Sequence, residues 1–220
     1  MSRDASATRD KLLRSAEHLI ARHGLDVPIR EIHAHAGQRN ASAIQYHFGG
    51  KEELLQAVID HHAPTPDDME AVRVDLDTRT HDPRGFMEAI VRRLSGYLGD
   101  ESSRDYVRVS FHVMQRVSMR AVLAEGSEHH SLTAVKAETE LLRSILPELP
   151  DRIVRERAVA AISFVAFEVS ERARLIDDGE AEVLLDEEDF IANLTDMAAA
   201  ILTAPTSIKE TTCGSTAKSR

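Results

Sequence analysis

Apolar residues recur along the first part of this chain at the spacing of one face of an α-helix. Leu12, Ala16 and Ile20 lie in one such stripe. Gly24 is placed to end this helix in a left-handed conformation. Pro28 is placed as the first residue of a second helix, where its missing N–H costs nothing. The pattern therefore predicts two helices separated by a short turn.

A third, short helix is predicted from about residue 40. Ala41, Ile44 and Phe48 are spaced to face inward from it. Its other positions form an exposed face of hydrogen-bonding groups and one small side chain: Arg39, Asn40, Ser42, Ala43, Gln45, Tyr46 and His47. Acidic residues are absent from 32–51 although the chain holds 37 of them. This absence is typical of a surface that meets phosphate groups.

The rest of the chain is also predicted to be helical. Lys51 opens a fourth helix over 51–62, and amphipathic segments follow at 67–77, 84–98, 103–124, 129–146, 151–176 and 187–203. The run 158–167 is apolar on almost every side, so a helix there must be buried all round. We find no convincing strand, and the predicted fold class is all-α.

The helices around Gly37 are typical of a helix-turn-helix, in which the second helix enters the major groove of DNA. We therefore place a DNA-binding domain at 1–50, with 51–62 as its connector. A proline-containing segment follows, and we place a C-terminal domain at 63–203. Residues 204–220 are polar and are expected to form a disordered tail.

Charge and composition narrow the class of protein. Residues 1–62 contain eight Lys/Arg and eight Asp/Glu, so the whole net charge of −10 belongs to the remainder. The two parts are therefore expected to do different work. The single cysteine, Cys213, excludes an intrachain disulfide and a cysteine-built metal site. We find no membrane-length apolar run and no secretory signal, so a cytoplasmic protein is expected.

Catalytic and metal-binding patterns are not found. A glycine-rich phosphate loop and a nucleophile motif are missing, so no catalytic residue and no cofactor are expected. His33 and His35 are two apart on a predicted helix and point to different faces. We expect surface histidines and no metal site. Arg9 is either part of a phosphate-binding arm or ordinary surface charge.

Two stretches of the N-terminal part, TRDKLLRSAEHLIARHG and PIREIHAHAGQRNASAIQYHFGGKEELLQAV, resemble the TetR family of transcriptional regulators. The strongest matches are Ala36-Gly37, Tyr46-His47-Phe48 and Lys51-Glu52-Glu53-Leu54-Leu55. The resemblance covers about residues 8–60. Beyond them only the size and the helical pattern agree.

The resemblance implies a homodimer that binds double-stranded DNA and a small-molecule effector. By position, Tyr46 and His47 would contact the DNA backbone and groove edge, and Lys51 would hold a phosphate. Bases or phosphates would be faced by Arg39, Asn40, Ser42 and Gln45. A two-fold dimer would read a palindromic operator, and we predict a repressor that the effector releases.

Four features depart from the family pattern. The segment between Gly37 and Tyr46 is one residue longer than usual, which shifts the base-reading roles. Gln45 replaces a tyrosine, and Val27-Pro28 replaces a Ser/Thr cap of the second helix. His33 stands where alanine is common, and we expect it to lean outward or to separate two helices slightly.

The C-terminal domain is predicted to hold both the dimer contact and the effector. Helices 151–176 and 187–203 are expected to pack with their twins as a four-helix bundle, because one subunit alone would struggle to cover their apolar surfaces. An apolar or amphipathic effector is expected within 84–176, with the fourth helix as the lever to DNA. Candidate lining residues, with simple core as the alternative, are Phe111, His112, Met114, Gln115, Phe164, Phe167 and Glu168.

Two other functions stay open at this point. One is a DNA-binding regulator without an effector, or an activator. The other is a helical enzyme in which the helix-turn-helix is incidental. Salt dependence of DNA binding discriminates between them, because a DNA reader releases counterions when it binds.

Overall fold

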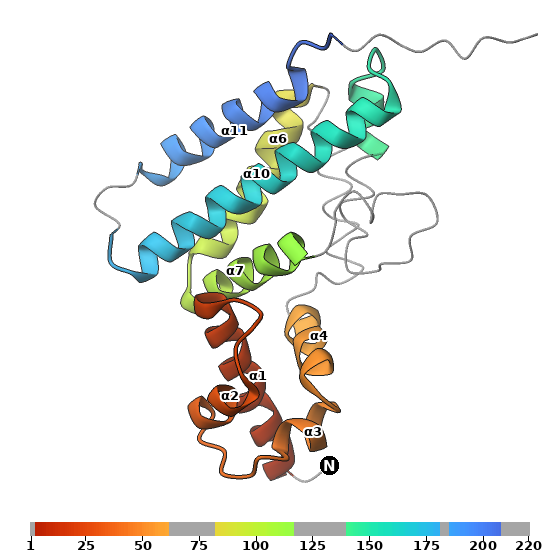
Figure 1. The fold of residues 1–220 in the computed structure, drawn as a ribbon. Helices are drawn as coiled ribbons and strands as arrows, with labels where there is room; N and C mark the ends of the chain where they lie inside the picture. Colours follow the sequence, from red (N-terminus) through yellow and green to blue (C-terminus); the bar gives the residue numbers. More distant parts are fainter. Residues whose placement is uncertain (1–2, 62–81, 117–139, 181–184, 208–220) are drawn as a thin grey trace, which may run out of the picture.

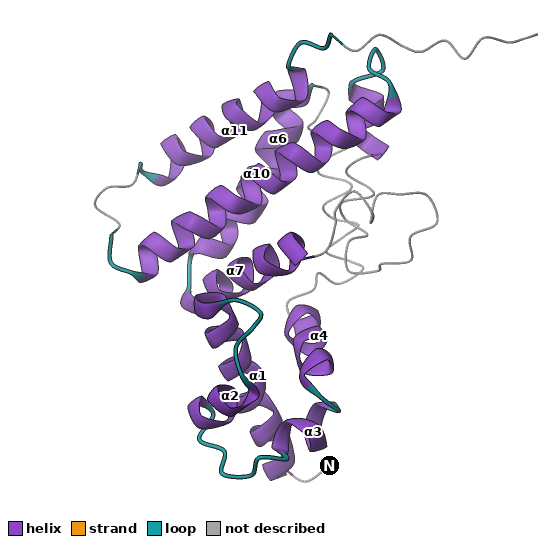
Figure 2. Cartoon of the chain, viewed as in Figure 1, coloured by secondary structure: helices purple, strands orange, loops and turns teal. Residues whose placement is uncertain are grey.

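The computed structural model describes residues 3–61, 82–116, 140–180 and 185–207. Regular structure in these ranges is helical, as predicted (Figure 2). The helices are α1 (Arg3–His23), α2 (Ile29–His35), α3 (Ala43–Phe48), α4 (Lys51–His61), α6 (Pro83–Ser95), the 3-10 turn η1 (Gly96–Leu98), α7 (Glu101–Arg116), α10 (Asp151–Asp177) and α11 (Glu187–Thr203). None of the helices in these ranges is both long and apolar enough to cross a membrane.

The described chain forms two lobes (Figure 1). Helices α1 to α4 form a small lobe, and α6, α7, α10 and α11 form a larger one. α10 packs on both α7 and α11, and α6 packs on α11. The lobes meet mainly where α1 contacts α7, with a smaller contact between α4 and α7. The small lobe therefore presents its far end, with α2 and α3, away from the large lobe.

Apolar side chains from all four of its helices form the core of the small lobe. Its buried members are Leu12, Leu13, Ala16, Ile20, Ala21, Val27, Ile32, Ala43, Ile44, Leu54 and Val58. Complete burial of one such leucine, isoleucine or valine contributes about 1.5–3 kcal/mol. Val109 of α7 belongs to the same core, so the lobes also share an apolar contact.

Glycines follow two helices of the small lobe in the left-handed conformation. Gly24, predicted to end the first helix, has a φ of +80° and accordingly follows α1. Gly49 ends α3 in the left-handed conformation with a φ of +96°, a region that side chains with a Cβ rarely adopt. Pro28 lies one residue before α2, as its N-cap, and makes no side-chain capping bond. The predicted loss of a capping bond at this helix is confirmed.

The spacing of apolar residues predicted the first and last residues of the two long C-terminal helices to within one position. The predicted 151–176 is α10, and the predicted 187–203 is α11. The segment 84–98 is α6 followed by η1. The predicted helix 67–77, most of 129–146 and the disordered tail beyond residue 207 lie outside the described residues.

The central run of α10 is covered only in part within one chain. We predicted that its central run is buried on every side, yet Phe167 is 46% exposed and Ala160 is also exposed. The buried residues of α10 face neighbouring helices of the larger lobe. Ala160 and Phe167 therefore stay exposed in the single chain, although the ring of Phe167 contacts Phe111 of α7.

Candidate nucleic-acid interface

The turn before α3, together with α3 and the start of α4, forms the free end of the small lobe (Figure 1). Arg39, Asn40, Ser42 and Gln45 are exposed there, as predicted. Tyr46 is 78% exposed. An aromatic ring left this far in water contributes little to the fold, so its exposure favours contact with a partner.

The structure corrects the prediction for Ala43, which was one of the residues expected to contact DNA. Its side chain is only 4% exposed and packs in the core, whereas Ala41, predicted to face inward, is exposed. α3 begins at Ala43 because the preceding residues form a turn of their own. The N–H of Ser42 donates to Asn40 Oδ1 at 2.9 Å, and this local bond competes with helix formation. The later start changes which side chains face the core.

The structure also corrects the prediction that His33 is a surface residue. We expected it to lean outward or to separate two helices slightly, and the first of these is wrong because it is only 6% exposed. Its Nε2 accepts a hydrogen bond from the backbone N–H of Ile44 at 3.3 Å. His33 therefore connects α2 to the beginning of α3. The prediction of a surface histidine was wrong because a buried imidazole is acceptable when a backbone donor satisfies it.

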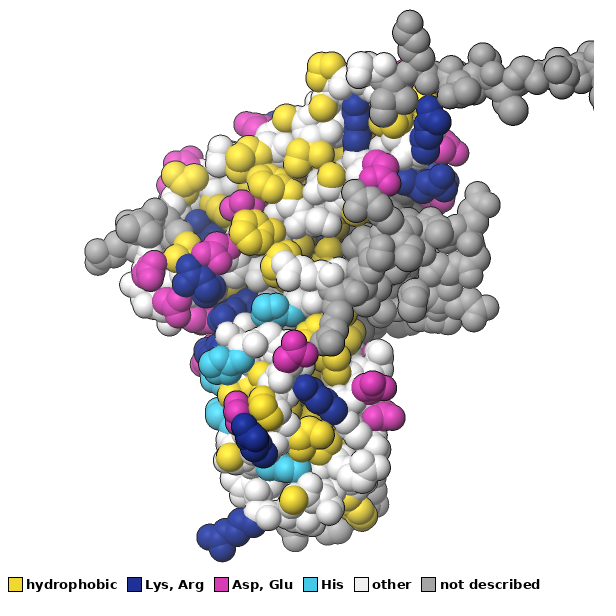
Figure 3. All heavy atoms as spheres, in the orientation of Figure 1, with side chains coloured by type: hydrophobic (Ala, Val, Ile, Leu, Met, Phe, Trp, Pro, Cys, Tyr) yellow, Lys and Arg dark blue, Asp and Glu magenta, His cyan; other side chains and the backbone are white. Residues whose placement is uncertain are grey.

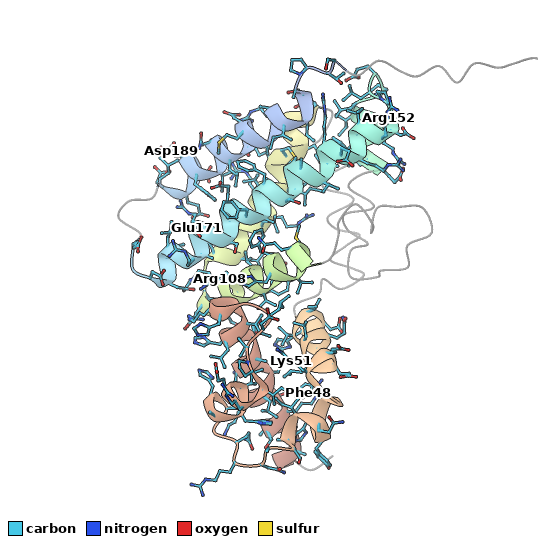
Figure 4. All side chains as sticks on the ribbon, in the orientation of Figure 1. Phe48, Lys51, Arg108, Arg152, Glu171 and Asp189 are labelled. Atoms are coloured by element: carbon cyan, nitrogen blue, oxygen red, sulfur yellow. The ribbon has the colours of Figure 1, made fainter. Side chains whose placement is uncertain are left out.

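Lys51 is the first residue of α4, directly after the turn at Gly49 and Gly50. It is half-buried, and Figure 4 marks it at the junction of α3 and α4, close to Phe48. The first backbone N–H groups of a helix point toward its N-terminal end. A lysine in that place adds a positive charge where an anion would meet those groups.

Arg9 does not extend away from the small lobe as a separate arm. Its guanidinium lies over the ring of Phe48, 4.8 Å from the ring centroid. His47 of α3 is half-buried, with its ring at 85° to that of Tyr46. These contacts hold side chains of α1 and α3 against each other at the free end of the small lobe. The arginine–phenylalanine contact was not predictable from helical periodicity.

A polar cluster lies where α1 contacts α7. Arg22 of α1 donates to Asp105 of α7 at 2.7 Å and to Glu101 at 3.1 Å. His18 Nδ1 lies 3.1 Å from the same Asp105 carboxylate. Burial raises the pKa of Asp105 above its usual range, against the lowering effect of the Arg22 charge. The cluster joins the two lobes through groups that sequence reasoning did not single out.

The same cluster has a metal-like composition. His18, Glu101 and Asp105 could each offer a ligand atom, and these atoms lie within 4.8 Å of one another. However, Nη1 of Arg22 lies 2.8 Å from His18 Nδ1 and 2.7 Å from Asp105 Oδ1. The guanidinium thus occupies the position between the donors that a cation would need.

The cluster continues to α10 through Asp177. Arg104 donates to it at 2.7 Å and Arg108 at 3.3 Å, both from α7. The side chains of Asp177 and Arg108 are 7% and 9% exposed. Figure 4 marks Arg108 near the junction of the two lobes. One run of ionic contacts therefore reaches from α1 across α7 to the end of α10.

The predicted effector-lining residues are only partly brought together. The rings of Phe111 and Phe167 are in contact, with centroids 5.6 Å apart, and His112 lies beside Phe111. Met114 and Phe164 pack against the core of the larger lobe. Gln115 is exposed.

Glu168, the last of that set, lines a different hollow. This groove of about 230 Å³ lies between α10 and α11 and also includes Arg172, Phe190 and Met197. The guanidinium of Arg172 lies 4.3 Å from the centroid of the Phe190 ring. Burial lowers the pKa of Arg172.

Comparison with known proteins gives a family for the small lobe. Residues 12–58 match the family described as "Bacterial regulatory proteins, tetR family". These residues include α2, α3 and most of α1 and α4. The match therefore covers the predicted DNA-reading end. A search of curated proteins finds no match to this chain.

Solved structures resemble the whole chain at low sequence identity. NalD, the secondary repressor of the MexAB-OprM multidrug efflux pump in Pseudomonas aeruginosa, is 19% identical with a TM-score of 0.54. That alignment covers 90% of this chain and 96% of NalD. A gamma-butyrolactone receptor described as an ArpA-like protein is also 19% identical, with a TM-score of 0.48 over 89% of this chain and 98% of the receptor chain. The likeness to NalD shows a shared fold across both lobes.

Proposed function

We propose, from the premise that this chain belongs to the TetR family of bacterial regulatory proteins, that it is a homodimeric repressor released from a palindromic operator by a small-molecule effector. The observation behind the proposal is the exposed, acid-free face of α3 within the matched segment. Such a face suits the major groove, because DNA phosphates repel carboxylates and attract the positive ends of basic side chains.

Roles at the DNA follow from the exposed side chains. Arg39 and Gln45 offer donors that pair with guanine or adenine edges, while Tyr46 and Lys51 are placed for backbone contacts. Asn40 and Ser42 lie beside them in the turn, and His47 lies beside Tyr46. In a two-fold dimer the two α3 helices would enter half-sites about 34–36 Å apart, or a multiple of one turn.

Substituting Lys51 by alanine should weaken binding to all DNA sequences alike. One phosphate contact fewer should reduce the slope of log affinity against log salt by about 0.9. The measurement is a fluorescence titration on a fragment selected from random DNA by the purified protein. Arg39→Ala is the companion variant, and it should instead relax base preference at one position, by about 1–3 kcal/mol. An unchanged slope for Lys51→Ala would contradict its phosphate role.

The proposed dimer contact is supported by exposed apolar side chains on α10 and α11. Phe167 and Met197 are 46% and 39% exposed. Figure 3 shows apolar side chains gathered over these two helices on the face toward the viewer. Exposed apolar patches of this kind mark protein interfaces. A second copy would cover the parts of Phe167 and Met197 that stay exposed in the single chain.

Met197→Glu should therefore dissociate the dimer. An unpaired carboxylate buried against a second copy costs several kcal/mol, so we expect the dimer dissociation constant to rise at least about 100-fold. Sedimentation velocity over a range of protein concentrations measures it. Gln56→Glu on α4 adds the same charge in the other lobe and should leave the dimer intact. Equal dimerisation of both variants would contradict the proposed interface.

The effector proposal is supported by aromatic side chains between α7 and α10. Phe111 and Phe167 touch there, with His112 as a polar neighbour. An apolar or amphipathic molecule that separates these rings would move α7, which contacts α1 of the small lobe. The molecule can act only through different affinities for the two states. Titration of compounds against the operator-bound dimer tests this, and an affinity that none of them alters would count against it.

A further inference from the structure

We propose that the imidazole of His33 holds α3 in its reading position only while it is uncharged, so that protons weaken the DNA-reading end. The inference rests on the proposed function and deepens it. It assigns control of the reading helix to a buried residue that does not touch DNA. It is based on the hydrogen bond between the Ile44 N–H and His33 Nε2 and on the lack of a side-chain cap from Ser42 at the start of α3.

α3 begins without a side-chain cap of its own. Its N-cap residue, Ser42, makes no side-chain bond to the helix, and its first turn contains no acid. The N–H of Ile44 instead donates to His33 Nε2 at 3.3 Å. His33 is 6% exposed and Ile44 1%, so bulk water does not replace this bond. A side chain of α2 therefore supplies the cap that α3 lacks.

The bond determines where the proton of His33 lies. A backbone N–H can only donate, so Nε2 accepts and holds no hydrogen. The ring is then neutral, with its proton on Nδ1. A second proton would turn the acceptor into a donor that faces another donor. It would leave the Ile44 amide buried without a partner and add positive charge at the positive end of a helix.

The helices next to His33 carry other titratable side chains, and their effects have to be separated from the effect of His33. The helices around His33 contribute Arg14, Glu17 and His18 from α1, Arg30, Glu31 and His35 from α2, Arg39 from the turn, and Tyr46 and His47 from α3. His18 and His35 stack on each other with ring centroids 5.1 Å apart, and Glu17 acts on Tyr106 of α7. A proton on His47 would attract DNA, an effect opposite in sign to that expected for His33.

Two variants of the full-length protein isolate the role of His33. His33→Gln retains an acceptor on a side chain that does not titrate. His33→Leu retains apolar bulk and loses the acceptor. At about pH 7.5 we expect His33→Gln to bind the selected DNA like the unmodified protein. We expect His33→Leu to bind about tenfold more weakly, the equivalent of one lost buried hydrogen bond.

The pH profile is the decisive readout. As pH falls from about 7.5 to about 5.5, imidazoles become charged. Over this range the unmodified protein should lose more DNA affinity than His33→Gln, because only the unmodified protein can lose its acceptor by taking up a proton. Parallel pH profiles of these two proteins would overturn the proposal. A His33→Leu variant that binds as tightly as the unmodified protein at about pH 7.5 would also overturn it.

A measurement without DNA separates this inference from the proposed function. Hydrogen exchange of the Ile44 amide is followed by NMR in protein labelled with ¹⁵N-isoleucine. At about pH 5.5 the amide should exchange faster in the unmodified protein than in His33→Gln. Equal exchange rates at this pH would overturn the inference. The expected difference together with no DNA binding at any pH would support the role of His33 and contradict the DNA-binding function.

Discussion

Asp177→Asn is expected to lower the free energy of unfolding by about 3–5 kcal/mol, the usual result of removing one partner from a buried ion pair. Asp177 accepts from Arg104 at 2.7 Å and from Arg108 at 3.3 Å. The substitution removes the charge and keeps the shape, so two guanidinium groups that are 14% and 9% exposed lose their counter-ion. Urea unfolding at one fixed protein concentration measures the change, because the stability of a dimer depends on concentration.

The next residue along the chain provides a matched control. Asp178 pairs with Arg174, but these side chains are 47% and 39% exposed. An exposed pair of this kind contributes about 0–1 kcal/mol. Asp178→Asn should therefore shift the unfolding midpoint only slightly. If both variants lose the same stability, the ionic contacts between α7 and α10 do not stabilise this junction.

Gln45→Glu is expected to reduce DNA affinity at least about 100-fold. Gln45 is exposed on α3, in a stretch where the sequence has no acid. In the proposed complex a carboxylate at this place would face the phosphates and acceptor groups of the groove, and like charges forced together cost several kcal/mol. Fluorescence anisotropy with the selected DNA, at one stated salt concentration, measures the loss. Circular dichroism should report an unchanged helix content.

Gln56→Glu is the control for added charge. Gln56 is exposed on α4 and donates to Asp60 at 2.7 Å. The acid pair created there should weaken the helix by only a few tenths of a kcal/mol. If Gln45→Glu binds DNA as tightly as the unmodified protein, as Gln56→Glu should, α3 does not enter the groove. Loss of binding in both would indicate that net charge alone decides affinity.

The ionic contacts also bear on how the lobes communicate. From the sequence, the fourth helix was the expected lever, because it connects the two predicted domains. The structure places the larger contact between α1 and α7, with Arg22 and Asp105 at its centre. A rotation of α7 would therefore act on α1 directly. Asp105 is buried and its partner Arg22 is 26% exposed, so such a rotation would have to break or shift a partly desolvated pair.

Local features of this protein were determined by the sequence alone. The spans of α10 and α11, the helix end at Gly24 and the missing cap after Val27 depend on residues a few positions apart. Helical periodicity and glycine conformation are local properties, so they can be read along the chain. The exposed reading face was also predictable for Arg39, Gln45 and Tyr46.

Tertiary structure decided the rest. Ala43 lies inside and Ala41 outside because a turn bonded through Asn40 delays the start of α3. His33 is buried because an amide 11 positions away on another helix satisfies its ring nitrogen. His18 meets Asp105 across 87 positions. Periodicity gives the face of a side chain but not its partner, and for buried polar groups the partner decides whether burial is tolerated.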